Sequence, residues 1–134
     1  MSSNGKGFYH TNVMLSIGEE FAIVCSAVIV EEDRERVMSE LRKARKYVID
    51  LTIEQTEKKM CANVIQVATK TGGKVIVMSD SAYNGFTEEQ RSLLEAEHGK
   101  IVIFPISKVI ETIGGGSARC MVAEVFNPSL TQVQ

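Results

Sequence analysis

The stretch Gly114-Gly115-Gly116-Ser117-Ala118-Arg119-Cys120 is followed at once by the apolar run Met121-Val122-Ala123-Glu124-Val125-Phe126. This order indicates a flexible loop that enters a strand, with Cys120 at the junction. Consecutive glycines let the backbone adopt positive φ and approach a ligand closely, and turned amide groups can stabilise a neighbouring thiolate. The stretch therefore predicts either a nucleophile at Cys120 or a glycine turn followed by an ordinary buried cysteine.

The composition indicates one domain, residues 1–134. Of these residues 44% are hydrophobic and 24% are charged, which is enough to bury a core and to keep the chain in solution. A net charge of −2 provides no basic field for nucleic acid or an anionic membrane. The sequence has neither an apolar signal region nor a run near the roughly 20 apolar residues of a membrane span, so we expect a cytoplasmic protein.

The cysteine pattern argues against a disulfide-stabilised protein and against a metal-binding one. Cys25, Cys61 and Cys120 are odd in number, widely separated and outside any CxxC pair. Neither a disulfide framework nor a metal site is expected, and reduced thiols are the default. Cys25 and Cys61 are expected to be small packed apolar side chains.

The first half of the chain predicts a hairpin and a long helix. Residues 9–17 and 21–30 are strand-like and are separated by a short turn at Gly18. Acidic residues then open a stretch in which apolar side chains recur at helical spacing. These apolar positions are Val37, Leu41, Ala44 and Val48.

The rest of the chain predicts a similar order. Thr52 and Thr87 each begin a capping box, and Gly99 is placed to end the second of these helices. Strands are expected over residues 64–68, 74–78, 101–104 and 119–123. This weak two-unit repeat predicts an α/β fold of two stacked modules, whose open edges favour self-association or pairing with a further segment.

Three segments resemble the amidinotransferase and arginine-deiminase superfamily, in particular its citrulline- or arginine-hydrolysing, amidinotransferase-like branch. They are Tyr9-His10-Thr11-Asn12-Val13-Met14-Leu15-Ser16-Ile17-Gly18, Ala62-Asn63-Val64-Ile65, and residues 113–126. The resemblance implies a partial pentein, an α/β-propeller of ββαβ modules about a pseudo-fivefold axis. About two modules are present, so the chain is expected to be the C-terminal half of a pentein-like fold, whether a natural truncation, one product of a split gene or a fragment.

The same resemblance implies attack by a cysteine thiolate on the guanidinium or ureido carbon of an arginine- or citrulline-like small molecule. Cys120 matches the nucleophile and His10 matches the histidine that moves protons, and no cofactor is implied. Asn12 stands where many deiminases carry a second carboxylate, so substrate nitrogens would meet a neutral amide there. The expected substrate-binding residues are Asn12, Asn63, Gly115 and Gly116.

Two functions remain open. In the family, acidic residues that grip the guanidinium come from the N-terminal half, and none is matched here. The chain is therefore either one part of a hydrolase or amidinotransferase-like enzyme, weak or inactive alone, or a noncatalytic interaction module. In both cases a homo-oligomer or a separate N-terminal half is the expected partner, with no nucleic acid and no membrane.

Other polar residues have more ordinary expected roles. His98 should lie on the surface at a helix C-terminus, and Glu111 and Glu124 should face solvent. Alternation along the expected last strand points Arg119 away from Cys120. Asn63 either orients substrate or forms a turn.

Overall fold

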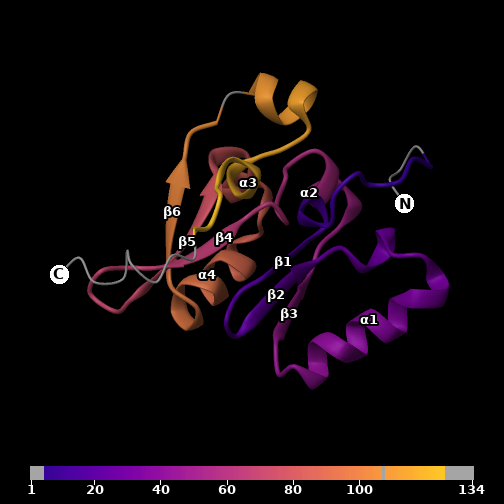
Figure 1. The fold of residues 1–134 in the computed structure, drawn as a ribbon, viewed down its shortest axis with the longest axis horizontal. Coiled ribbons are helices and arrows are strands. Elements are labelled where there is room, and N and C mark those ends of the chain that lie inside the picture. The colour runs from indigo at the N-terminus through magenta and orange to yellow at the C-terminus, as the bar shows by residue number, and fades with distance from the viewer. Residues whose placement is uncertain (1–4, 107, 126–134) are drawn as a thin grey trace.

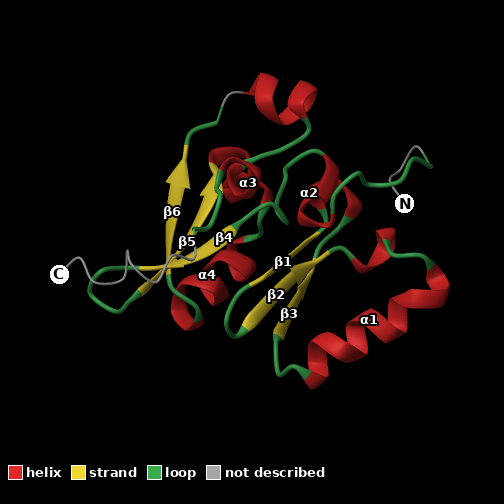
Figure 2. Cartoon of the chain, in the orientation of Figure 1, coloured by secondary structure: helices red, strands yellow, loops and turns green. Residues whose placement is uncertain are grey.

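Two ββαβ modules follow one another along the chain in the computed structural model, which describes residues 5–106 and 108–125 (Figures 1 and 2). The first consists of β1 (Leu15–Ile17), β2 (Phe21–Val24), α1 (Glu31–Lys43) and β3 (Tyr47–Asp50). The second consists of β4 (Ile65–Ala68), β5 (Lys74–Ser79), α3 (Asp80–Gly85), α4 (Glu88–Glu97) and β6 (Lys100–Phe104). Helix α2 (Ile53–Glu57) lies between the two modules in sequence.

The two sheets have the same topology. In each, the first two strands are antiparallel and the second and third are parallel, with the strand orders β1-β2-β3 and β4-β5-β6. The parallel connection in each sheet passes through a helix, as parallel pairing requires. The predicted α/β fold of repeated modules is therefore confirmed.

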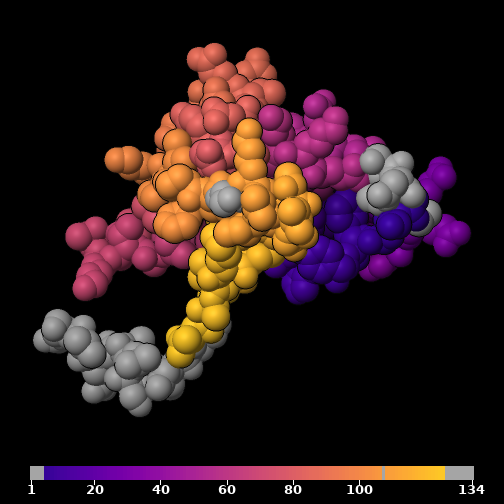
Figure 3. Space-filling view, turned by 90° about the horizontal axis from the view of Figure 1, so that it is seen from above, coloured from indigo at the N-terminus to yellow at the C-terminus, as the bar shows by residue number. Residues whose placement is uncertain are grey.

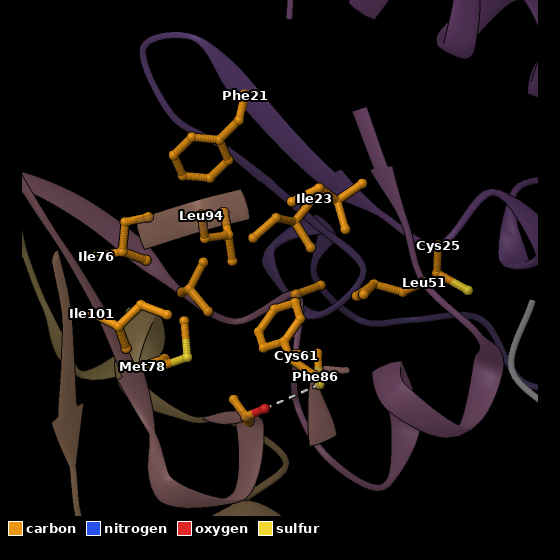
Figure 4. Packing of buried hydrophobic residues seen from close by; sticks show 14 of the residues in the cluster. Phe21, Ile23, Cys25, Leu51, Cys61, Ile76, Met78, Phe86, Leu94 and Ile101 are labelled. Atoms are coloured by element: carbon orange, nitrogen blue, oxygen red, sulfur yellow. Dashed lines mark hydrogen bonds between the residues drawn. The ribbon is translucent and has the colours of Figure 1, made fainter. Parts of the chain in front are cut away.

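The helices divide the molecule into layers. Helix α1 covers one face of the first sheet, where Leu41 packs with Ala22 and Val24. Helix α4 lies between the two sheets (Figure 1), and its Leu94 is fully buried. Side chains from both modules meet there in one core (Figure 4), formed by Phe21, Ile23, Cys25, Val28, Ile49, Leu51, Cys61, Ala62, Val64, Ile76, Met78, Ala82, Phe86, Leu94 and Ile101.

The predicted hairpin forms, but its strands are shorter than expected. Residues 11–13 form a 3₁₀ turn that precedes β1, and residues 26–28 form another that follows β2. At the hairpin, Gly18 is required because a Cβ there would lie 2.3 Å from the Phe21 ring. The close approach of this ring lets the turn fold over the core.

The long helix predicted after the hairpin is present, but it ends earlier than predicted. Helix α1 stops at Lys43, and Arg45 adopts a left-handed φ of 55°. The Lys46 amide then donates to the Leu41 carbonyl, a closing pattern typical of helix ends. Beyond it, Val48 belongs to β3, whose backbone pairs with β2. The helical spacing of Val48 from Leu41 is therefore coincidental, because pairing with β2 places Val48 in a strand.

Both predicted capping boxes are present, at Thr52 and Thr87. Gly99 follows α4 with φ +127°, and a Cβ there would lie 2.6 Å from the Lys74 carbonyl oxygen. The helix stop predicted at Gly99 is therefore confirmed, and it serves a close backbone contact with β5.

The strand predicted over residues 119–123 is not formed. Residues Ala118–Met121 make a 3₁₀ turn instead. The Cys120 amide donates to the Ser117 carbonyl and the Arg119 amide donates to the Asn63 carbonyl. These amides are thus engaged in a local turn and in one long-range contact, and they are not available to a strand ladder.

Candidate active site

Cys120 lies on the 3₁₀ turn that follows the glycine-rich loop, and its side chain is exposed. Gly115 has φ +72°, a conformation that glycine adopts without strain. A Cβ on Gly116 would lie 3.1 Å from the Cys120 Sγ. The glycines therefore shape the turn and leave space beside the thiol.

Asn63 is the residue that holds this turn in place. Its side chain is fully buried, and its Nδ2 donates to the Cys120 Sγ at 3.0 Å and to the Asn12 carbonyl at 2.8 Å. Its Oδ1 accepts from the amides of Ser117 at 3.1 Å and Cys120 at 3.3 Å. All four hydrogen-bonding positions of the amide are used. Asn63 is therefore a buried hub, which goes beyond the turn expected from its residue type.

Asn12 links the N-terminal segment to the thiol. The Cys120 Sγ donates to the side-chain Oδ1 of Asn12 at 3.5 Å, and the backbone N–H of Asn12 donates to the His10 Nδ1 at 3.3 Å. His10 itself is exposed and caps the 3₁₀ turn Thr11–Val13. The hydrogen bonds thus connect His10 to Cys120 through Asn12, across most of the length of the chain.

Tyr9 fastens the glycine loop to the N-terminal segment. Its hydroxyl donates to the Gly115 carbonyl, and a Cβ on Gly115 would lie 3.5 Å from the tyrosine ring. Partial desolvation, and then the charge of Cys120, raise the pKa of Tyr9. In Figure 3 the last described residues, in yellow, leave the body of the molecule beside the indigo N-terminal segment. Sequence reasoning missed Tyr9, although its place next to His10 could have drawn attention to it.

Glu111 supports the same loop from the interior, which corrects its expected solvent exposure. It lies on the π-helical turn Ile110–Gly114, is 6% exposed, and accepts from the Ser117 Oγ at 2.6 Å. Ser117 is fully buried as well. The carboxylate and hydroxyl satisfy each other, so the loop that precedes Cys120 has a buried anchor.

A pocket of about 330 Å³ lies beside the thiol-bearing turn. Its walls come mainly from the N-terminal segment with β1, from the start of β4, and from the chain around Cys120. The polar side chains on it include His10, Asn12, Ser16, Arg119 and Glu124. Arg119 therefore borders the same pocket as His10. The alternation argument for Arg119 does not apply, because a 3₁₀ turn replaces the strand.

His98 is buried, although its position in the sequence predicted that it would lie on the surface. It is 9% exposed and packs against the rings of Phe21 and Tyr47, with centroid separations of 5.0 and 6.2 Å. The Gln66 side chain donates to its carbonyl. His98 thus belongs to the contact between the modules, where the β1–β2 turn covers the end of α4.

The remaining expectations concern cysteines, metals and membranes. Cys25 and Cys61 are fully buried in the core, as predicted. Among the described residues, no cluster of three or more His, Cys, Asp or Glu side chains could hold a metal ion. None of the helices in the described part of the chain is long and apolar enough to cross a membrane.

A repeated ββαβ topology, with a cysteine on the turn after a glycine-rich loop, defines a pentein-type protein related to guanidino-group hydrolases. The family model described as "N,N dimethylarginine dimethylhydrolase, eukaryotic" matches residues 1–127, and the chain belongs to this family. The predicted superfamily is thereby confirmed.

A solved structure supports the same fold. It is the apo structure of ArgZ, an arginine dihydrolase from the ornithine-ammonia cycle in Cyanobacteria, which matches with a TM-score of 0.62 and 13% sequence identity. The match covers 90% of this chain and 17% of that one. The chain therefore spans less than one fifth of the ArgZ chain, and at this identity the likeness concerns the fold alone. No curated protein sequence matches.

Proposed function

We propose that this chain supplies the nucleophile of a hydrolase that acts on the guanidino or ureido group of an arginine- or citrulline-like small molecule. The observation that carries the proposal is the hydrogen bond from Asn63 Nδ2 to Cys120 Sγ at 3.0 Å. A donor fixed on a thiol sulfur favours the thiolate, which is the reactive form. Membership of the dimethylarginine dimethylhydrolase family adds methylarginines to the candidate substrates.

The proposed reaction has two steps. The Cys120 thiolate attacks the guanidino carbon, the bond from that carbon to the departing nitrogen breaks, and His10 gives a proton to the leaving amine or ammonia. Water then attacks the same carbon, His10 takes a proton from it, and the carbon–sulfur bond breaks to return the thiolate. Water and a guanidino substrate are thus converted into an amine or ammonia and a ureido product, and a ureido substrate would give a carbamate in the same way.

The neighbouring residues have supporting roles in this proposal. Asn12 lies between His10 and Cys120 and presents an amide, which can accept from a substrate N–H or donate to a ureido oxygen. Gly115 and Gly116 leave room for a planar group next to the sulfur, and the Tyr9 hydroxyl holds the Gly115 carbonyl. Asn63 acts on the thiol and on the turn, and not on the substrate.

Selective alkylation tests the nucleophile. Brief iodoacetamide treatment near neutral pH, read by mass spectrometry, should label Cys120 well before the buried Cys25 and Cys61. Exposure alone would also give fast labelling, so Asn63→Ala, which removes the donor to the Cys120 Sγ, should slow it. Labelling of Cys120 no faster than at Cys25 would refute the assignment, and an unchanged rate in Asn63→Ala would refute activation by this donor.

A turnover assay tests the reaction. Arginine, citrulline, asymmetric dimethylarginine and agmatine should be converted slowly or not at all by the isolated chain, because no acidic residues that grip the guanidinium are matched in it. Any residual conversion should disappear in Cys120→Ser. Turnover at an ordinary rate of about 1 per second or more would show that the grip is not needed.

The second candidate function is a noncatalytic interaction module, and one observation favours it. Among the described residues, a pocket of about 400 Å³ between the second sheet and the thiol-bearing turn is lined by the apolar side chains of Val77, Phe104, Ala118, Met121 and Val122. An open apolar pocket of this kind is a site for another chain, either a second copy or a separate N-terminal half. Light scattering of the isolated chain should detect association, and Phe104→Glu should reduce it. A strictly monomeric wild type at micromolar concentrations would count against self-association.

A further inference from the structure

Glu111 is a buried acidic residue that the proposed reaction does not use. On its π-helical turn Glu111 is buried, whereas the apolar side chains of Ile110 and Ile113 are 42% and 82% exposed. Isolated π-helical turns occur often at functional sites. The hydrophobic effect alone would favour the reverse arrangement, so a polar contact has to account for the buried carboxylate.

That contact is with Ser117, which immediately precedes the thiol-bearing turn Ala118–Met121. The hydroxyl of the fully buried Ser117 donates to the Glu111 Oε1 at 2.6 Å. Because both groups are buried, breaking this bond would leave two polar groups without a partner, which is unfavourable. Glu111 therefore fixes the position of Ser117.

The backbone of Ser117 passes this constraint to Asn63. The Ser117 amide donates to the Asn63 Oδ1 at 3.1 Å, and the Cys120 amide donates to the same oxygen at 3.3 Å. An amide side chain whose oxygen faces two N–H donors is held against rotation by 180°, because its NH₂ group would then meet those donors. The two backbone amides thus determine which end of the Asn63 side chain faces the thiol.

The end of Asn63 that is oriented in this way contacts the sulfur. Its Nδ2 donates to the Cys120 Sγ at 3.0 Å and to the Asn12 carbonyl at 2.8 Å. A rotated side chain would present an oxygen to the sulfur, and an oxygen does not stabilise a thiolate. The hydrogen bonds form one continuous series that begins at Glu111, passes through Ser117 and Asn63, and ends at Cys120.

We infer that Glu111 is a positioning residue for the proposed nucleophile, and that it acts on Cys120 through Ser117 and Asn63. The inference rests on the proposed function, to which it adds a control of thiol reactivity from the interior of the molecule. Without the Glu111 carboxyl group, Ser117 is free to move. The Asn63 amide then loses one of the two donors that orient it, and its own hydrogen bond to the sulfur weakens. The reactivity of the thiol should fall although no atom of Cys120 is changed.

Alkylation rates of three variants test the inference. Glu111→Ala, Ser117→Ala and Glu111→Gln are treated briefly with iodoacetamide near neutral pH, and labelling at Cys120 is read by mass spectrometry. Glu111→Ala and Ser117→Ala should each slow this labelling by about threefold or more, near the lower end of couplings within one hydrogen-bond network. Glu111→Gln should stay within about twofold of the wild-type rate, because a glutamine oxygen can still accept from the Ser117 hydroxyl.

Cys25 separates positioning from loss of the fold. This thiol is fully buried in the core, so it is labelled only when the protein opens. If Glu111→Ala merely loosened the structure, labelling of Cys25 would rise, and this result would overturn the inference. A positioning role predicts slower labelling of Cys120 with Cys25 still protected. Should Glu111→Ala fail to fold, the contrast between Ser117→Ala and Glu111→Gln provides the same test.

A double variant tests the route through Asn63. Asn63→Ala already removes the donor to the Cys120 Sγ, so adding Glu111→Ala should slow the labelling of Cys120 no further. Such non-additivity is expected of residues in one network. A second loss of about threefold in the double variant would mean that Glu111 acts by another route, and the inference would be wrong.

A matched control is the serine–carboxylate hydrogen bond of the first module. The Ser26 Oγ donates to the Asp50 Oδ2 at 2.5 Å, and Ser26→Ala should leave the labelling rate of Cys120 unchanged. Equal slowing by Ser26→Ala and Ser117→Ala would overturn the inference. So would an unchanged rate in Glu111→Ala or Ser117→Ala, or a loss in Glu111→Gln as large as that in Glu111→Ala.

The wild-type rates keep this inference apart from the proposed function. If Cys120 of the wild type is labelled no faster than Cys25, the proposed nucleophile is wrong and the inference fails with it. If Cys120 is labelled quickly in the wild type and equally quickly in Glu111→Ala, the nucleophile stands and only the role of Glu111 is wrong.

Discussion

The two modules share one topology but differ in how their sheets are covered. The first sheet has α1 on one face and α4 on the other, and all four residues of β2 are buried (Figure 1). On the α4 side of the second sheet Ile76, Met78 and Ile101 are buried, while Ile103 is 44% exposed. On the other face of this sheet Val102 and Phe104 are 40% and 53% exposed. A ββαβ unit therefore buries its sheet completely only when a helix from a neighbouring unit covers the second face.

The helices show the same asymmetry. Helix α4 packs both Leu94 and Leu93 into the shared core, whereas α1 buries Leu41 and carries ion pairs on its outer surface. The charged outer surface of α1 is suited to solvent. The outer face of the second sheet is covered in part by the Ala118–Met121 turn and leaves apolar side chains exposed, so the two ends of the array are chemically different.

The largest expected effect compares one phenylalanine from each kind of face. Phe21→Ala removes a ring that is 1% exposed in the shared core and should lower the free energy of unfolding by about 3–5 kcal/mol. Phe104→Ala, on the outer face of the second sheet, should change the stability of the monomer by about 0.5 kcal/mol or less, because that ring is 53% exposed. Urea denaturation of both variants at low protein concentration provides the measurement. Similar losses would mean that the second face is covered in solution.

Whether an element depends on neighbouring residues or on distant ones explains which elements could be predicted from sequence. The helix starts at Thr52 and Thr87 were predictable because capping depends on neighbouring residues alone. The strand at Val48 was not predictable. Its spacing from Leu41 is a local pattern that indicates a helix, and only pairing with β2 places Val48 in a strand. The turn at Cys120 was missed for a similar reason. The Cys120 amide donates to the nearby Ser117 carbonyl and also to the side chain of Asn63, which is far away in sequence.

The second prediction concerns the core between the modules at high pH. Burial raises the pKa of the Cys61 thiol from 9.0 to about 12, against a smaller lowering by Lys59. Above pH 9 the unfolded chain therefore loses this proton more readily than the folded one, so stability falls as pH rises through the window from 9 to 12. The loss approaches about 1.4 kcal/mol per pH unit.

Other groups also titrate in this pH range, so the measurement is a difference. The stability of Cys61→Ala is subtracted from that of the wild type at several pH values between about 8.5 and 10.5. The wild-type advantage should shrink as pH rises. A constant difference would show that Cys61 is accessible to water, and that the shared core is more open than Figure 4 indicates.

The third prediction compares a buried and an exposed asparagine. Asn63→Ala leaves two amides and the thiol without their partner, and it should lower stability by about 1–3 kcal/mol. Asn84→Ala removes one exposed hydrogen bond, to the Asp80 carbonyl, and should cost less than about 0.5 kcal/mol. The rate of Cys120 alkylation near neutral pH should fall in Asn63→Ala only, because the donor to the Cys120 Sγ is lost. An unchanged rate would limit Asn63 to a structural role.

The candidate site was predictable in part. Cys120, Asn63 and Asn12 were selected from sequence, and the structure brings them into contact. The direction of Arg119 could not be derived from strand alternation, because the backbone there is a 3₁₀ turn. Glu111 was misjudged because acidic residues are usually exposed, and only its contact with Ser117 lets it be buried.

The smallest expected effect tests whether the two capping boxes act independently. The Gln55 Oε1 accepts from the Thr52 amide, while its Nε2 donates to the Gln90 Oε1 at 2.8 Å. That same Gln90 oxygen accepts from the Thr87 amide. The helix starts of α2 and α4 are thus joined by one side-chain contact, so loss of either cap frees the glutamine that supports the other.

Each of Thr52→Ala and Thr87→Ala should lower the free energy of unfolding by about 1 kcal/mol. If the boxes are coupled, the double variant should differ from the sum of the single ones by about 0.5 kcal/mol or more. A control cycle pairs Thr52→Ala with Thr69→Ala, which removes the hydrogen bond from the Gly73 amide in the turn between β4 and β5 and involves neither glutamine. Additivity in that cycle, with non-additivity between Thr52 and Thr87, would show that the N-terminus of α4 is coupled to α2 through Gln55 and Gln90. Additivity in both would show that the two caps act independently.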